Sequence, residues 1–254
     1  MAITGAAGLL ATWEAGLAEP PAGRALLLHR TARPDLDAGT LPALPVGKRE
    51  ADLFTLRRAL FGERMQVRLA CAACGEDMEF DLDTAEFARS AAGRDESAGP
   101  GAAVGPGEVV VRVRSDGWDV EFRLPGVADL TAAGRAEDPR RALLARCLVS
   151  AVHDGAAVAA GDLPGPVQRR IAEAVEAADP GADVTLNVAC PECGQATRAE
   201  LDIASYLWTE LDAWARDLLL DVHLLATAYG WSEPEILALS PLRRRYYLEL
   251  CADV

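Results

Sequence analysis

The stretch VRLACAACGEDMEFDLDTAEF (67–87) recurs further along the chain as LNVACPECGQATRAELDIASY (186–206). A C-x-x-C-G loop turns tightly enough to point two sulfurs at one metal ion, and each such loop supplies half of a tetrahedral shell. The repeat therefore predicts one zinc site made from two halves. Its expected ligands are Cys71, Cys74, Cys190 and Cys193.

The two cysteine pairs are separated by 115 residues, between Cys74 and Cys190, whereas zinc-ribbon loops are commonly about 15–20 residues apart. Closing the longer loop costs only roughly 2 kcal/mol more, because the entropy of loop closure grows with the logarithm of loop length. Structural zinc binding contributes on the order of 10–16 kcal/mol, which easily exceeds that cost. We therefore expect a split zinc ribbon, residues 67–87 with 186–206, and an inserted domain between its halves.

Two other uses of the cysteines are open. The CxxC pairs could be reduced thiols packed in a core, or one pair could be redox-active. A redox pair needs a βαβ surround and a helix N-terminus beneath the cysteine, and neither pair has that context. Cys147 lies among leucines and is expected to be a buried small hydrophobe, and Cys251 is expected to be equally inert.

The rest of the chain predicts an α+β protein that is mainly helical. Apolar alternation on both sides of Ser115-Asp116-Gly117 predicts a β-hairpin. Asp138 before Pro139 is typical of a helix start, and we expect this helix to continue to about residue 152, followed by a second over about 165–178. Residues 203–229 lack proline and glycine and predict the longest helix.

These elements suggest four regions. They are an N-terminal helical region (1–66), the split ribbon (67–87 plus 186–206), an inserted hairpin and helices with a flexible glycine-rich loop at 88–107 (88–185), and a long helix with a short helix pair (207–254).

Composition limits the function. The chain has 254 residues and a formal net charge of −14, which opposes binding to phosphate backbones. Its apolar runs are interrupted by charges and its first residues lack a basic signal region, so we expect a cytoplasmic protein without a transmembrane helix. In that compartment cysteines stay reduced, which favours metal binding over disulfides.

No catalytic residue is evident, and we expect no enzymatic activity. Four thiolates leave a zinc ion without the open position that hydrolysis requires. His29, His153 and His223 stand in no metal-binding or catalytic pattern, and no nucleotide-binding or nucleophile loop follows a predicted strand. No small-molecule substrate is therefore expected.

Three stretches carry a family resemblance: EFRLPGVADL (121–130), CPECG (190–194) and LDIASYLWTELDAWARDLLLDVHLLATAYGWSEPEILALSPLRRRYYLEL (201–250). They resemble the phage baseplate proteins encoded in contractile injection system clusters, which are related to the baseplate hub assembly chaperones of T-even-type phages. The resemblance implies a non-enzymatic part in building the baseplate of a phage-tail-like particle, with other baseplate or hub proteins as partners. It leaves open whether the protein stays in the finished particle.

The C-terminal region is the expected docking element. It holds more apolar and aromatic groups, beside arginines, than two short helices can hide between themselves, and this composition is typical of an interface centre. The candidate partner-binding residues are Trp231, Ile236, Leu239, Arg243, Arg244 and Tyr247. Two alternatives are that these side chains pack on the long helix as ordinary core, and that the chain is a zinc-ribbon nucleic-acid-binding or regulatory protein.

Overall fold

A computed structural model describes residues 5–84 and 109–252, and the glycine-rich segment expected to be a flexible loop, 88–107, lies outside them. The chain divides into two compact units, one combining residues 1–31 with 204–254 and the other spanning 32–203. We describe each unit by itself. Within the described residues, no helix combines the length and apolarity that crossing a bilayer requires.

The first unit is built from helices at both ends of the chain. They are α1 (Ala6–Leu17), α2 (Pro21–Ala32), α8 (Ile203–Tyr229), α9 (Glu233–Leu237) and α10 (Pro241–Ala252). α1 approaches α8 closely at Gly16, where an added Cβ would lie 2.3 Å from the Trp208 ring. The Trp13 Nε1–H donates to Asp212 Oδ1 over 2.8 Å, and the Arg24 guanidinium lies 4.8 Å from the centre of the Trp208 ring. These contacts hold the N-terminal helices against α8.

α8 has the bounds that its lack of proline and glycine predicts. Its buried residues recur at the helical period and include Leu207, Leu211, Leu218 and Leu225. Gly230, at a φ of +70°, ends it in the left-handed conformation that glycine adopts without strain. α9 then begins with the expected capping box, in which the Glu235 carboxylate accepts from the backbone N–H and the hydroxyl of Ser232.

The second unit contains two separate two-stranded hairpins and one four-stranded antiparallel sheet. The hairpins are β1 (Arg64–Ala70) with β2 (Asp77–Asp83), and β7 (Thr185–Ala189) with β8 (Ala196–Glu200). The sheet has the order β3 (Val110–Ser115), β4 (Trp118–Arg123), β5 (Leu148–His153) and β6 (Ala156–Ala157). The helical elements are η1 (Leu41–Ala43), α3 (Val46–Phe61), α5 (Val127–Gly134), α6 (Pro139–Cys147), η2 (Ala160–Asp162), α7 (Gly165–Ala178) and η3 (Pro180–Ala182).

The four-stranded sheet has one apolar and one charged face. Val120 and Phe122 of β4 pack with Cys147 of α6 and Ile171 of α7 in one buried cluster. Residues of β3 and β4 that alternate with these point to solvent and form ion pairs across the strands, such as Arg112 with Asp119. The sheet therefore follows the apolar alternation of the sequence, and Cys147 is buried as expected.

The expected helix to about residue 152 is wrong, because α6 ends at Cys147 and Leu148–His153 form strand β5. β5 pairs with β4, placing Ala151 opposite Val120. It then turns at Asp154-Gly155, with φ angles of +48° and +85°. His153 consequently lies on a strand and stacks on Trp118, with ring centres 4.4 Å apart. Strand pairing outweighs a helical propensity that β-branched valines already weaken.

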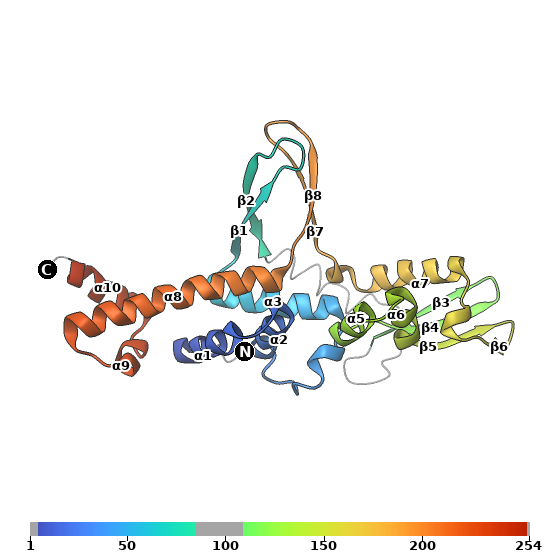
Figure 1. Ribbon diagram of the computed structural model, residues 1–254, viewed down its shortest axis with the longest axis horizontal. Helices are drawn as coiled ribbons and strands as arrows, with labels where there is room; N and C mark the ends of the chain where they lie inside the picture. Colours follow the sequence, from blue (N-terminus) through green and yellow to red (C-terminus); the bar gives the residue numbers. More distant parts are fainter. Residues whose placement is uncertain (1–4, 85–108, 253–254) are drawn as a thin grey trace. The chain divides into compact units, whose positions relative to one another are not determined.

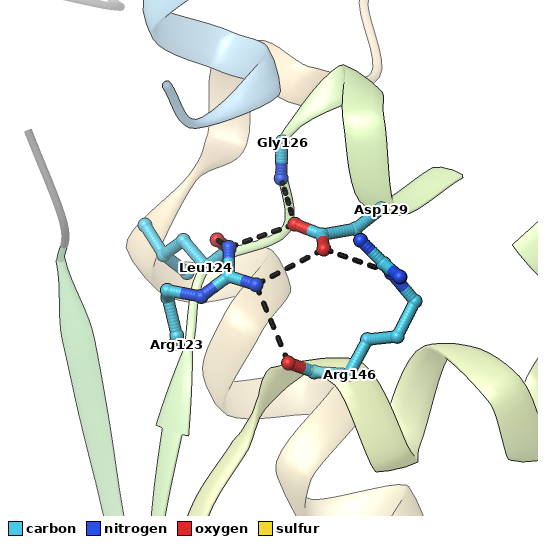
Figure 2. A network of polar contacts seen from close by, with 5 residues as sticks. All are labelled: Arg123, Leu124, Gly126, Asp129 and Arg146. Atoms are coloured by element: carbon cyan, nitrogen blue, oxygen red, sulfur yellow. Dashed lines mark hydrogen bonds and ion pairs between the residues drawn. The ribbon is translucent and has the colours of Figure 1, made fainter. Parts of the chain in front are cut away.

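A buried ionic network joins the sheet to α5 and α6 (Figure 2). Asp129 is only 3% exposed, and its carboxylate binds the guanidiniums of Arg123, at 2.7 and 3.0 Å, and of Arg146, at 3.1 Å. It also accepts from the backbone N–H of Gly126 over 3.0 Å. Burial acts to raise the pKa of Asp129, but these donors outweigh it and lower the pKa below its ordinary value.

Gly126 connects this network to the start of α3. Its backbone bridges to Pro45, and the N–H of Val46 donates to the carbonyl oxygen of Pro125 over 3.2 Å. An added Cβ at Gly126 would lie 2.6 Å from the carbonyl oxygen of Pro42. Because the obstruction is backbone, only glycine permits this close approach.

Candidate metal centre

The loops of the two hairpins meet and bring four cysteines together (Figure 1). The Sγ atoms of Cys71, Cys74, Cys190 and Cys193 all lie within 4.8 Å of one another. Two of the distances, Cys71 to Cys193 and Cys74 to Cys190, are 3.7 Å. Tetrahedral zinc with Zn–S bonds of about 2.3 Å requires sulfurs about 3.8 Å apart. The cluster is therefore close to the size that one such ion needs.

The backbone of the two loops is nearly identical. The N–H of Gly75 donates to the carbonyl oxygen of Cys71, and that of Gly194 to the carbonyl oxygen of Cys190, each over 2.9 Å. Both glycines have positive φ angles, +77° and +70°. A side chain would strain this conformation, which explains why glycine follows the second cysteine of each pair.

The loop also favours a thiolate at its first cysteine. The backbone N–H groups of Cys74 and, next, Ala73 donate to the sulfur of Cys71 and lower its pKa to about 6. The N–H of Glu76 acts in the same direction on Cys74, but the neighbouring sulfurs of Cys193 and Cys71 outweigh it and raise the pKa of Cys74 to about 12. Four thiolates without a cation would repel one another, and a divalent ion would remove that penalty.

Few apolar contacts connect the two hairpins at the cluster. Cys71 and Cys190 are buried with Met78, and Leu69 and Val188 pack against them, whereas Cys74 and Cys193 are exposed. Such a small core contributes little apolar burial. A shared metal ion would therefore supply most of the connection between the tips of the hairpins.

Thr197 occupies the position in the second hairpin that Met78 has in the first. Its buried Oγ1 has no hydrogen-bond partner among the described residues. We expect Thr197→Val to raise the free energy of unfolding by about 1 kcal/mol, because valine keeps the shape and removes an unsatisfied hydroxyl. Chemical denaturation measures this difference.

The matched control is Thr185→Val in the same hairpin, because the Thr185 hydroxyl donates to Asp183 over 2.9 Å. This substitution should leave stability unchanged or lower it. A Thr197→Val variant less stable than wild type would mean that the hydroxyl has a partner in solution.

Two of the six candidate partner-binding residues are buried within the first unit. Ile236 is fully buried, and Arg244 is 9% exposed with its Nε 2.9 Å from Asp221 Oδ2. Both act inside the first unit, because α9 and α10 fold back on the end of α8. Direct contact between either residue and a partner would require local unfolding.

The other four candidates lie nearer to solvent. Trp231 and Tyr247 are half-buried and form a three-ring cluster with Tyr229. The centre of the Trp231 ring lies 4.7 Å from that of Tyr229 and 4.9 Å from that of Tyr247. Leu239 is half-buried and Arg243 is exposed. The ring cluster packs α10 against the end of α8.

Sequence reasoning did not identify an exposed apolar row on α10, which Tyr246 forms with Leu242 and Leu250. Leu242, Tyr246 and Leu250 are 66%, 61% and 58% exposed. Their spacing of four residues places them on one face of the helix, opposite the face that holds Arg244. The i, i+4, i+8 spacing of these three apolar residues is visible in the sequence and could have indicated an apolar face opposite Arg244.

The architecture defines a mixed helix-and-sheet protein with a four-cysteine centre of the kind that holds structural metal ions. The family model described as T4 bacteriophage base plate protein matches residues 31–208. The chain belongs to this family and is a phage baseplate protein. No curated protein and no solved structure matches the chain.

The matched region covers the second unit and the first turns of α8. It confirms the resemblance to baseplate proteins. Most of the C-terminal stretch 201–250, on which the resemblance also rests, lies beyond the matched residues.

Proposed function

We propose that the chain is a non-enzymatic baseplate protein, or a baseplate hub assembly factor, of a phage-tail-like contractile injection system. In this proposal one zinc ion stabilises the scaffold, and the C-terminal helices dock onto other baseplate proteins. The protein would be made in the cytoplasm and act within, or during the assembly of, the particle. The observation that carries the proposal is the four-sulfur cluster inside the region that matches the baseplate family.

Zinc is the metal that the donor set favours. Four thiolates are soft ligands, and a tetrahedral S4 arrangement is typical of zinc or iron. The sulfur separations of 3.7 Å suit a single ion. All four positions of such a shell are taken by the protein, which supports a structural role for the metal.

The end of the first unit suits a docking role. The Tyr229, Trp231 and Tyr247 rings are packed together while remaining partly accessible. Rigid aromatic groups beside an arginine such as Arg243 bind with little loss of conformational entropy. The surface is therefore suited to a protein partner.

The test is co-purification with the baseplate components of a reconstituted particle, using the double variant Leu239→Asp, Arg243→Glu. Both side chains are accessible, so the variant should keep wild-type helicity and metal content while losing co-purification. Deleting residues 231–254 is a less specific test, because it also removes Ile236 from the core of the first unit.

An exposed leucine on another helix provides the control. Leu17→Asp changes α1 and should leave co-purification intact. Co-purification of the double variant at the wild-type level would contradict the proposal that the C-terminal helices bind other baseplate proteins.

The alternative of a nucleic-acid-binding protein is less well supported. Of the three consecutive arginines, Arg244 pairs with Asp221 and Arg245 with Glu249. Of these three, only Arg243 has no carboxylate partner among the described residues, and a single unpaired arginine in this run, on a chain of net charge −14, is a poor phosphate-binding surface. Retention on DNA at low salt would restore this alternative.

A further inference from the structure

A large apolar groove lies between α6 and α7 of the second unit, two helices that neighbour each other beside the sheet (Figure 1). It has a volume of about 1020 Å3. Its apolar lining comes from the sheet and from both helices. Phe122 and Ile171 line it as buried core residues, and Leu143, Leu144 and Val175 are half-buried and accessible. The proposed docking role of the C-terminal helices makes no use of this groove.

The exposed row on α10 has the chemistry and length to fill such a groove. Leu242, Tyr246 and Leu250 repeat every four residues, the spacing with which a helix anchors in an apolar groove. α10 has 12 residues and is about 18 Å long, and α7 has 14 residues and is about 21 Å long.

Charges on the two surfaces are complementary. On α10, Arg243 and Glu249 lie on opposite flanks of the apolar row, since each residue advances the helix by about 100°. The α7 side of the groove carries Glu173 and Glu176 with Arg169, and the α6 side carries Arg140. Arg198 of β8 also lines the groove. Arg243 can thus face the glutamates, while Glu249, which also pairs with Arg245 of its own helix over 3.0 Å, faces Arg140.

The other two carboxylates that line the groove have donors within the fold. Asp179 accepts from the backbone N–H of Gly47 over 3.0 Å, and Asp183 accepts from the Thr185 hydroxyl over 2.9 Å. They therefore do not compete for the cations of an incoming helix.

We propose that α10 of one copy of the chain binds in the α6–α7 groove of another copy. This inference rests on the proposed function only in taking the C-terminal helices as a docking element, and it names another copy of the chain as one partner. The contact is heterologous, because the two surfaces in contact are different. It joins copies head to tail, and such contacts close into rings or extend as filaments.

The test is sedimentation velocity of the purified full chain over a concentration series. Wild type should self-associate as concentration rises. Tyr246→Glu disables the helix and Ala172→Trp blocks the groove, and each should remain monomeric at concentrations about tenfold above those at which wild type associates. Both positions are exposed, so circular dichroism should show unchanged folding. Leu130→Glu, at an exposed leucine of α5, is the control and should associate like wild type.

Mixing the two defective variants tests the head-to-tail geometry directly. Ala172→Trp retains an intact helix and Tyr246→Glu an intact groove, so the mixture should form a 1:1 heterodimer and stop there. A fluorescein-labelled peptide of residues 239–252 should bind Tyr246→Glu and bind Ala172→Trp about tenfold more weakly. Arg243→Glu should weaken association, and Glu176→Arg in the mixing partner should restore it.

The proposal is overturned if wild type stays monomeric, if the mixed variants do not pair, or if the peptide binds both variants equally. Pairing between two copies of α10 would give no complementation and is excluded by a positive mixing result. The measurement uses no other baseplate protein, so its failure leaves the docking proposal standing. Conversely, a co-purification result that contradicts the docking proposal would leave self-association to be decided by the sedimentation experiment.

Discussion

Replacing Cys190 by serine is expected to reduce the zinc content from one ion per chain to a small fraction of that. Serine keeps the size of the side chain but is not deprotonated at neutral pH, so the shell loses one of its four ligands. Losing only a hydrogen-bond partner of a ligand costs about 10–100-fold in metal affinity, and losing a ligand should cost more than about 100-fold. Elemental analysis of the purified protein measures the zinc content.

The thiols of the opposite hairpin give a second readout. Cys71 and Cys74 should be protected from thiol reagents in wild type and become reactive in Cys190→Ser, because one ion is expected to hold both hairpins. Cys251→Ser removes a thiol that is not part of the four-cysteine cluster and should leave the metal content unchanged. Two ions per chain, or a wild type whose six thiols all react, would contradict a single shared site.

The expected effect on stability is also large. The cluster has few apolar contacts of its own, and binding energy at a structural zinc site is folding energy, on the order of 10–16 kcal/mol in small domains. Chelation of wild type should therefore unfold the hairpin tips and expose Met78. The sheet has its own core around Phe122 and Ile171 and should retain its fold.

Asp129→Asn is expected to lower the free energy of unfolding by about 3 kcal/mol, because it removes the buried carboxylate that pairs with the guanidiniums of both Arg123 and Arg146. The same change weakens the link through Gly126 to the start of α3, since the Asp129 carboxylate accepts from the Gly126 N–H. Urea denaturation followed by circular dichroism measures the loss.

Asp119→Asn is the matched control, since it removes the ion pairs with Arg112 and Arg114 on the surface of the sheet. Pairs of this kind contribute about 0–1 kcal/mol. An equal loss of unfolding free energy in Asp129→Asn and Asp119→Asn would contradict a larger contribution from the buried network.

The same network predicts a pH dependence. The pKa of Asp129 is lowered below its ordinary 3.8 in the folded chain, so the unfolded chain takes up a proton first as pH falls. The network's contribution is therefore complete above about pH 5 and is lost as the pH falls through the lowered pKa. The difference in stability between wild type and Asp129→Asn should shrink over that acidic range.

Local signals in the sequence were sufficient for several elements. The bounds of α8 follow from the absence of helix breakers before Gly230, and the β3–β4 hairpin follows from alternation around Asp116-Gly117. The same Asp-Gly signal stands at Asp154-Gly155 and could have revealed β5. The helix start at Asp138 favoured a longer helix instead. The helix ends at Cys147 because the residues that follow pair with β4, which is distant in sequence.

The sequence by itself determined which four cysteines come together, because each C-x-x-C-G loop is a local turn whose geometry depends on its own residues. The repeat of that loop was enough to predict that Cys71, Cys74, Cys190 and Cys193 belong together. Only the tertiary structure decided that Ile236 and Arg244 are buried and that Asp129 is the centre of an ionic network. It also decided that a groove opens between α6 and α7. Burial and ion pairing depend on which elements pack together, and these elements are far apart in the chain.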